Sequence, residues 1–423
     1  MTDKTLTRRT ALTAAAATLL AAKTALPSGA FAAGPGPEVA RAKLGFIALT
    51  DASPLIIAKE RGLFAKYGMP DVEVLKQASW GGTRDNLVLG SGGGGIDGAH
   101  ILTPMPYQFT TGVATGGRPV PMNILARLNT NGQAISVGND LKAVKVGLNS
   151  AGAKAKFAQM KAAGNIPKVA MTFRGGTHDL WLRYWLAAGG INPETEVSTI
   201  VIPPPQMVAN MKAGTQDAFC VGEPWNGQLV NQKVGYTACL TSEIWMNHPE
   251  KCLGVRADWV AKYPRAAQAL TIAVMEAQMW CDKAANKAAM CSIVSGRQYI
   301  NVPMGDILPR LQGTINYGDG RAVKGSGHVM KFWADNASFP FKSHDLWFVT
   351  ENQRWGVMPR NTNAAALVAK VNRADIWRAA AKSLGVGAPA SDSRGVERFF
   401  DGKVFDPANP AAYLASQPIK KLV

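Results

Sequence analysis

Apolar and polar positions follow two different periods along this chain, beginning near residue 43. Residues 44–49 form a mostly apolar run, which predicts a buried strand, and residues 71–75 alternate between apolar and polar, which predicts a second strand. A helix is predicted between them, with Ser53 as its N-cap and Pro54 at its first helical position. Strand, helix and strand form a βαβ unit, which binds ligands at the carboxyl end of its first strand.

The same alternation of strand and helix patterns continues through the middle of the chain, which indicates parallel sheets and an α/β fold class. Further strands are predicted at residues 144–148, 169–173, 197–202 and 218–221, and helices at 154–163, 179–188 and 206–213. Beyond about residue 258 the pattern is mostly helical, over 263–287, 304–312 and 364–384.

A chain of 423 residues is too long for one ordinary core and suits two lobes. Two stretches, 135–140 and 252–256, are predicted to cross between the lobes. One lobe would then combine residues 33–137 with 254–423, the latter ending in C-terminal helices, and the other lobe would be residues 138–253. A solute would bind in the cleft between the lobes, because domain interfaces favour ligand sites.

Residues 1–32 have the features of an export signal. Arg8 and Arg9 precede a short apolar run, 14–22, and Ala30-Phe31-Ala32 is a small-x-small cleavage site, so the mature chain is expected to start at Ala33. The paired arginines favour the twin-arginine route, which exports folded proteins. The apolar run is too short to span a membrane, and no cysteine near the cleavage site provides a lipid anchor, so we expect a periplasmic protein.

Composition excludes several function classes. The formal net charge is +17, but the basic residues are scattered, which argues against nucleic acid and favours attraction of small anions. The five cysteines form no Cys-x-x-Cys pair, the five histidines lack metal-ligand spacing, and no nucleophile elbow or carboxylate pair calls for an enzyme. The glycine-rich run 90–95 follows a helix and precedes a strand, the reverse of a dinucleotide-binding loop, and is interpreted as a connector. No metal and no cofactor are expected.

Several polar residues lie where predicted strands end or lobes meet. Trp80 follows the second strand, and its indole N–H is donor-only. In the segment Gly175-Gly176-Thr177-His178, the glycines let the backbone approach a ligand, Thr177 can cap a helix, and His178 can donate to an oxyanion. Each also has an ordinary structural interpretation, in which the tryptophan packs in the core and the histidine supports the helix start.

Three more candidates lie near the predicted crossings. Gln133 offers amide donors, although turn chemistry explains it equally well. Gly222 ends a strand in the segment 222–226. Lys251 follows His248-Pro249-Glu250; a lone lysine is usually a surface charge, but at a hinge it can neutralise a bound anion.

Taken together, these segments resemble the nitrate- and bicarbonate-binding proteins of ABC uptake systems over nearly the whole mature chain. The segments that carry the resemblance are 49–51, 78–80, 97–100, 104–106, 131–133, 175–181, 222–226, 248–251, 256–259, 306–313, 353–356 and 399–402. The resemblance implies a two-lobed periplasmic binding protein fold of type II, with two parallel-core sheets and the ligand cleft between them. It also implies a permease and an ATPase as partners, and a monomer is expected.

The resemblance further implies that nitrate contacts fall on Trp80, Gln133, His178, Gly222 and Lys251. Within this family a lysine after His-Pro-Glu goes with nitrate, whereas the bicarbonate-binding relatives carry glutamate near it. Nitrate is a planar anion with three acceptor oxygens and no proton, so a donor-only, positively biased pocket suits it. Because neighbouring side chains usually diverge, Lys251 and not Glu250 is expected in the cleft.

The sequence therefore predicts a periplasmic receptor that binds nitrate, with nitrite as a second candidate ligand, without covalent chemistry. Three alternatives remain open. The same fold can bind bicarbonate or another small oxyanion such as a sulfonate. Some relatives are cytoplasmic nitrate sensors with a regulatory partner, a role against which the export signal argues. Pyrimidine synthases of thiamine formation share the fold, but their cysteine cluster is absent here.

Overall fold

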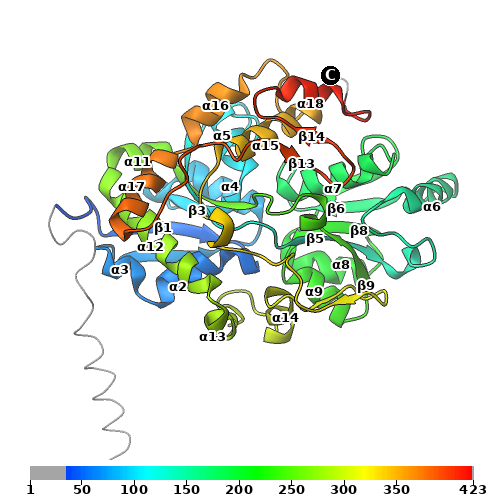
Figure 1. Ribbon diagram of the computed structural model, residues 1–423, viewed down its shortest axis with the longest axis horizontal. Coiled ribbons are helices and arrows are strands. Elements are labelled where there is room, and N and C mark those ends of the chain that lie inside the picture. The colour runs from blue at the N-terminus through cyan, green and yellow to red at the C-terminus, as the bar shows by residue number, and fades with distance from the viewer. Residues whose placement is uncertain (1–34, 422–423) are drawn as a thin grey trace, which may run out of the picture.

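The computed structural model of the protein describes residues 35–421 (Figure 1). The predicted export signal, residues 1–32, and its cleavage site lie outside the described residues. No helix between residues 35 and 421 combines the length and the apolar character that a membrane crossing requires.

The first of two five-stranded sheets, called here the β1 sheet, has the strand order β2-β1-β3-β10-β4. Its strands are β1 (Arg41–Phe46), β2 (Asp71–Lys76), β3 (Gly98–Leu102), β4 (Met122–Arg127) and β10 (Lys251–Arg256). Strands β2, β1 and β3 are parallel, whereas β10 is antiparallel to both of its neighbours. Helix α2 (Ser53–Glu60) contacts both β2 and the long helix α12 (Pro264–Asp282), and α5 (Pro104–Thr111) contacts β3 and β4.

The second sheet, called here the β5 sheet, has the order β7-β6-β8-β5-β9 and lies beside the β1 sheet (Figure 1). Its strands are β5 (Gln133–Gly138), β6 (Lys168–Met171), β7 (Ser198–Val201), β8 (Ala218–Gly222) and β9 (Gly235–Leu240). Strands β6, β7 and β8 are parallel, and β5 is antiparallel to β8 and β9. Helix α7 (Thr177–Ala188) contacts β6 and β8, and α8 (Met207–Lys212) contacts β8. Helix α9 (Trp225–Asn231) contacts β5, β8 and β9.

The chain passes between the two sheets twice, from β4 to β5 and from β9 back to β10. Strands β5 and β10 are the first strands that the chain forms after each passage. Both start at the edge of their sheet that faces the other sheet, so they run antiparallel to their neighbours. The predicted crossings at 135–140 and 252–256 are a few residues too late, because those residues lie largely within β5 and β10. The two sheets are therefore mixed, each with a parallel core, and the predicted α/β architecture is confirmed.

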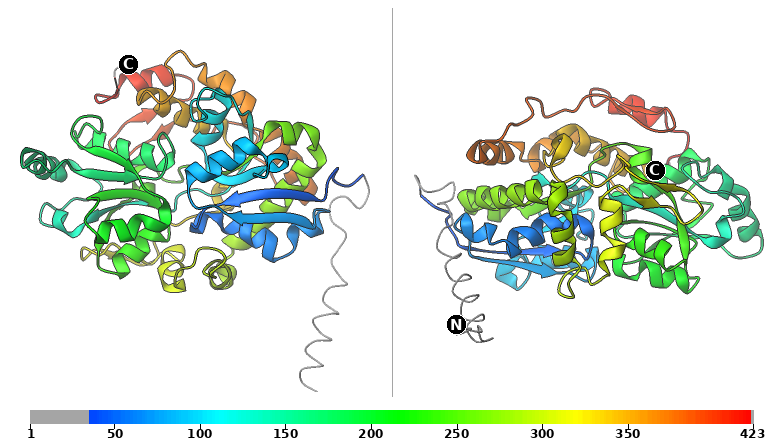
Figure 2. Two further views of the ribbon diagram at one scale, coloured as in Figure 1. Left: turned by 180° about the vertical axis from the view of Figure 1, so that it is seen from behind. Right: turned by 60° about the horizontal axis from the view of Figure 1, so that its bottom comes forward.

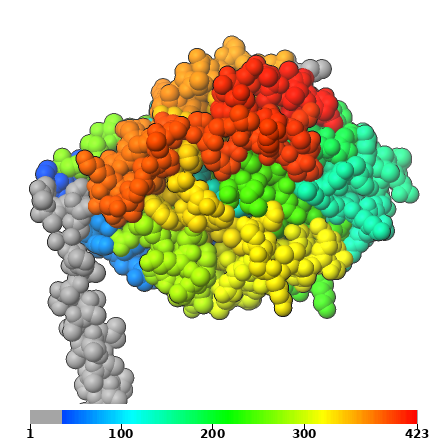
Figure 3. Space-filling model, viewed as in Figure 1, coloured from blue at the N-terminus to red at the C-terminus, as the bar shows by residue number. Residues whose placement is uncertain are grey.

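The chain after β10 covers both sheets, contrary to the expectation that it belongs to the first lobe alone. Helix α15 (Lys342–Arg354) contacts both α5 and α7, and α17 (Ala374–Leu384) packs on α12 and β4. Trp347 and Tyr413 belong to the same buried cluster as the strands of the β5 sheet. Figure 2 and Figure 3 show this yellow-to-red part of the chain running across both halves of the molecule.

Most predicted elements are present, with shifted ends. The strand predicted at 144–148 is wrong, since those residues form turns, and Ser53 does not cap α2 but is its first residue, with its hydroxyl donating to Thr50 O at 2.6 Å. Residues 91–93 form a short 3₁₀ turn between α4 and β3, which confirms the connector. The remaining elements are α3 (Leu63–Lys66), α4 (Trp80–Leu89), α6 (Ala151–Ala162), α10 (Thr241–Ile244), α11 (Ala257–Lys262), α13 (Lys287–Val294), α14 (Leu308–Leu311), α16 (Ala364–Val371), α18 (Pro410–Ala415), β11 (Ile315–Asn316), β12 (Ala322–Val323), β13 (Glu397–Arg398) and β14 (Val404–Phe405).

Candidate functional site

The fold brings all five candidate residues to the junction between the sheets. Gln133 is the first residue of β5 and pairs in register with Gly222, the last residue of β8. Lys251 is likewise the first residue of β10 and pairs with the last residue of β3. Parallel strands end, and the antiparallel strands begin, at the edges where the sheets meet. In open α/β sheets ligands bind at this edge.

Trp80 is the first residue of α4, which is capped by the hydroxyl of Ser79 accepting from Gly82 N at 3.0 Å. The Trp80 side chain is buried, and its Nε1 atom has no hydrogen-bond partner among the described residues. The Lys251 ammonium lies 5.9 Å from the ring centroid of Trp80. A buried indole N–H normally finds a partner, so this donor is available to a ligand.

His178 is the second residue of α7 and is buried. Its Nε2 atom lies 2.7 Å from Gln133 Oε1 and its Nδ1 atom 2.5 Å from the Thr172 hydroxyl. Because the amide oxygen can only accept, Nε2 carries the proton, and the hydroxyl donates to Nδ1. Burial, together with the charge of Lys251, lowers the pKa of His178 well below its ordinary value, so the imidazole is neutral near pH 7.

Asp51 lies at the centre of the site, although the sequence did not single it out as a site residue. It is in a 3₁₀ turn, Thr50–Ala52, shortly after β1, and its carboxylate accepts from Lys251 Nζ at 2.9 Å, Gln133 Nε2 at 3.0 Å and His100 Nε2 at 2.6 Å. Burial alone would raise its pKa, but Lys251 and His100 hold the pKa well below the ordinary range. The position of Asp51 in the loop after the first βαβ strand was a signal that could have identified it.

Glu250 also points into the site, so the expectation that it diverges from Lys251 is wrong. Glu250 Oε1 lies 2.8 Å from Lys251 Nζ, Oε2 accepts from Trp181 Nε1 at 3.0 Å, and the Thr177 hydroxyl donates to Oε1. Strand alternation begins only at Lys251, and Glu250 precedes β10, which lets both side chains turn the same way. Thr177 therefore does not cap α7, whose N-cap residue, Gly176, has no side chain to do so.

The site is therefore not donor-only, because two carboxylates flank the lysine. Burial raises the pKa of Glu250, and the nearby Lys251 only partly offsets this effect. Burial also opposes the charge on Lys251, but Asp51 and Glu250 outweigh it and raise the Lys251 pKa. With neutral histidines, the pocket carries one positive charge against one or two negative charges, depending on the protonation of Glu250.

Gly222 leaves the space that the other groups occupy. A Cβ atom added there would lie 2.7 Å from Gln133 Oε1 and 3.2 Å from Asp51 Oδ2. The remaining polar groups hold one another by hydrogen bonds, and no cluster of three or more His, Cys, Asp or Glu within residues 35–421 is arranged to bind a metal. The arrangement can bind a small polar ion.

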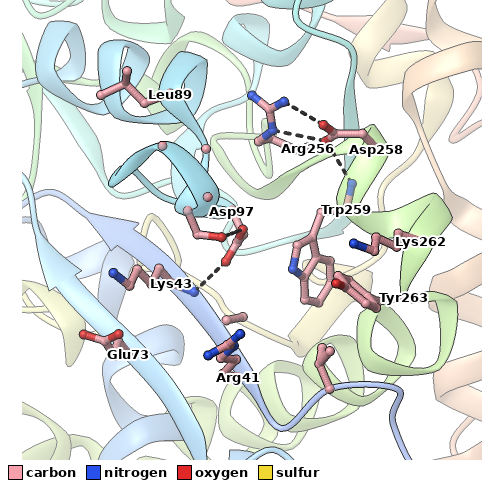
Figure 4. A pocket seen from close by; sticks show the side chains of 16 residues that line it. Arg41, Lys43, Glu73, Leu89, Asp97, Arg256, Asp258, Trp259, Lys262 and Tyr263 are labelled. Carbon is pink, nitrogen blue, oxygen red and sulfur yellow. Dashed lines mark hydrogen bonds and ion pairs between the residues drawn. The ribbon is translucent and has the colours of Figure 1, made fainter.

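A cavity of about 800 Å³ lies outside the candidate site, and none of the five candidate residues lines it (Figure 4). Arg41 and Lys43 line it from the start of β1, Asp97 from just before β3, and Lys262 from α11. These positions are at the opposite edge of the β1 sheet from the carboxyl ends of its parallel strands. The cavity is therefore separate from the candidate site.

Two α/β sheets with buried polar groups at their junction define the class of two-lobed solute-binding proteins. The model of the NMT1-like family matches residues 35–295, and the chain belongs to this family. The nitrate/nitrite binding protein NrtA of Synechocystis sp. is 61% identical over 390 residues, which cover 91% of this chain and 86% of that protein. The crystal structure of the periplasmic nitrate-binding protein NrtA from Synechocystis matches with a TM-score of 0.89 and covers 91% of this chain and 100% of that one.

Two further relatives extend the comparison. The bicarbonate-binding protein CmpA of Synechococcus sp. is 44% identical over 396 residues, which cover 91% of this chain and 88% of that protein. The nitrate import ATP-binding protein NrtC of Synechocystis sp. is 34% identical over 382 residues, which cover 90% of this chain and 56% of that protein. The predicted resemblance to the nitrate- and bicarbonate-binding family is confirmed.

Proposed function

We propose that this protein is the periplasmic receptor of an ABC uptake system that binds nitrate between its two sheets and delivers it to a permease driven by an ATPase. The 61% identity to NrtA, against 44% to CmpA, supports nitrate over bicarbonate. The relationship to the ATP-binding protein NrtC supports the transport partners. The observation that carries the proposal is the buried Trp80 N–H, which has no hydrogen-bond partner within residues 35–421 and belongs to a ring whose centroid lies 5.9 Å from the Lys251 ammonium.

The donors around Lys251 suit a flat anion. Trp80 Nε1 donates to no described residue, and Lys251 Nζ and Gln133 Nε2 each keep one proton beyond those given to Asp51 and Glu250. The single proton of His178 Nε2 is given to Gln133 Oε1 and would have to turn to an ion. Nitrate offers three acceptor oxygens and no proton. Hydrogen bonds between charged partners in a buried site are worth more than neutral ones. Gly222 keeps the site open to a small ion because a side chain there would meet Gln133 and Asp51.

Binding requires no covalent chemistry and no cofactor. We infer two lobes that close around the ion, with residues 33–137 and 138–253 contributing opposite walls and residues 254–423 joining them. Ligand contacts made only in the closed form would shift the population toward it. The closed monomer would dock on the permease, after export and cleavage near Ala32.

Bicarbonate is the second candidate, and one specific observation favours it. Glu250 and Asp51 place carboxylate oxygens beside Lys251, and bicarbonate carries an O–H that needs an acceptor. Against it, the same oxygens already accept bonds from Lys251, Thr177, Trp181, Gln133 and His100.

A competition titration separates the two candidates. The chain from Ala33 is titrated calorimetrically with nitrate, nitrite, bicarbonate and an alkanesulfonate, each at matched pH and ionic strength. The proposal predicts one nitrate site per chain and bicarbonate binding at least about tenfold weaker, the equivalent of about 1.4 kcal/mol. Tighter binding of bicarbonate would replace the proposal with the second candidate.

A further inference from the structure

A groove of about 630 Å³ is lined by residues next to the candidate site, although none of the five candidate residues lines it. Ser79 and Gly81, which flank Trp80, line it from the side of the β1 sheet, and Thr172 lines it from the β5 sheet. Thr172 is the residue whose hydroxyl donates to His178 Nδ1. The inner end of the groove is therefore formed by neighbours and partners of two candidate ligand residues.

The other cavity that reaches the site is much too small to admit an ion. It measures about 20 Å³ and is lined by Gln133, Glu223 and Arg310 among others. That volume holds about one water molecule. Access from solvent is therefore expected through the groove beside Trp80 and not past Gln133.

One uncompensated positive charge stands in this groove. Arg174 is exposed, lines the groove and makes no ion pair with any described carboxylate. The other arginine of the groove, Arg84, is paired with Asp85 at 2.8 Å. Arg174 also lies only four residues before His178, in the loop between β6 and α7.

The backbone of this loop is held across the junction. The carbonyl of Arg174 accepts from Gln108 Nε2 at 3.3 Å, and that of Gly175 accepts from Asn352 Nδ2 at 3.1 Å. Gln108 and Asn352 are themselves joined at 3.0 Å. Gly175 has φ +67°, and a Cβ atom there would lie 2.3 Å from Asn352 Oδ1, so the loop packs closely against residues of α5 and α15.

We propose that the groove is the entrance to the site and that Arg174 attracts the anion there, so that it raises the association rate without contacting the bound ion. The inference rests on the proposed nitrate function. A fixed positive charge at the mouth of a cleft raises the local concentration of anions and the rate of encounter. Because Arg174 acts at a distance and dissociation is unchanged, its effect on affinity is expected to equal its small effect on the association rate.

The test is stopped-flow tryptophan fluorescence of nitrate binding by the mature chain, at about 10 mM and about 500 mM of a salt whose anion does not bind. A single charge about 10 Å away is worth about 0.4 kcal/mol in water, about a twofold change in rate. We expect Arg174→Gln to slow association about twofold and Arg174→Glu about fourfold at low salt, with unchanged dissociation. Both differences should vanish at high salt, because screening shortens the reach of the charge.

Arg297 provides the matched control, since it is exposed, unpaired among the described residues and not part of the groove lining. Arg297→Glu should associate like wild type. Association of Arg174→Glu at the wild-type rate, or a change confined to dissociation, would overturn the inference. Absence of any nitrate binding by the wild-type chain would instead contradict the proposed function.

Discussion

The Nζ atom of Lys251 lies 2.8 Å from the Oε1 atom of its neighbour in the chain, Glu250, and both side chains are buried. Asp51 lies on another side of the same ammonium at 2.9 Å. If both carboxylates are ionised, the site already has a net negative charge, and an entering anion makes that charge more negative. Burial raises the pKa of Glu250, so this carboxylate is the one that can take up a proton as nitrate binds.

Nitrate affinity is therefore predicted to increase as the pH falls toward the raised pKa of Glu250. Protonation removes the negative charge beside Lys251, whereas Asp51 stays ionised because its pKa is held low, and His178 stays neutral because its pKa is also lowered. Glu250→Gln should bind nitrate about tenfold more tightly than wild type at pH 8 and lose most of the pH dependence. Calorimetry between pH 5 and pH 8 checks this; equal or weaker binding by the variant at pH 8 would contradict it.

Lys251→Glu is predicted to abolish nitrate binding. The change removes the only positive side chain among the five candidates and adds a third carboxylate next to Asp51 and Glu250. Lys262→Glu, a change of the same charge in the separate cavity of Figure 4, should keep wild-type affinity. Calorimetric titration compares the two variants, and nitrate binding by Lys251→Glu at wild-type strength would place the ion elsewhere.

Trp80→Phe is predicted to weaken nitrate binding about tenfold to hundredfold. The variant removes a donor that has no partner in the part of the chain that the structure describes, and a hydrogen bond to a charged group contributes about 1.5–3 kcal/mol. Trp377→Phe is the control. The Trp377 indole is not one of the candidate residues, and its Nε1 already donates to the Ser338 hydroxyl at 2.9 Å. The control should lower the melting temperature but leave nitrate affinity unchanged. Unchanged affinity in Trp80→Phe would mean that the free N–H does not face the ion.

Gly222→Ala is predicted to weaken both binding and folding. Its Cβ atom would press on Gln133 Oε1, which His178 holds at 2.7 Å, and overpacking of this kind costs about 1–3 kcal/mol. Gly305→Ala, where no atom lies within 4 Å of the added Cβ, should be neutral. Urea denaturation and nitrate titration of both variants make the comparison. A Gly222→Ala protein with wild-type nitrate affinity would show that nitrate binding does not require the space beside Gly222.

The local pattern of the chain was enough to predict the α/β class and the edge at which the five candidate residues lie. The run 218–221 became strand β8, because buried parallel strands have a strong apolar signal, and the alternating run 71–75 became β2 at the edge of its sheet. The strand predicted at 144–148 failed, because a short apolar run that does not pair with a neighbouring strand is not held extended.

The convergence of side chains was harder to predict than their positions. Glu250 reaches the same point as Lys251 because β10 begins one residue later, a boundary that periodicity does not fix. The position of Asp51 depends on how the loop after β1 meets His100, Gln133 and Lys251, which are distant in sequence. Such contacts arise only when both sheets are assembled.

The most direct measurement is a crystal structure of the mature chain grown with nitrate, with data sufficient to place a planar ion. The account predicts one nitrate with its oxygens within hydrogen-bond distance of Trp80 Nε1 and Lys251 Nζ, between the β1 and β5 sheets. A site without nitrate at saturating concentration, or nitrate bound only in the cavity beside Arg41 and Lys43, would contradict it.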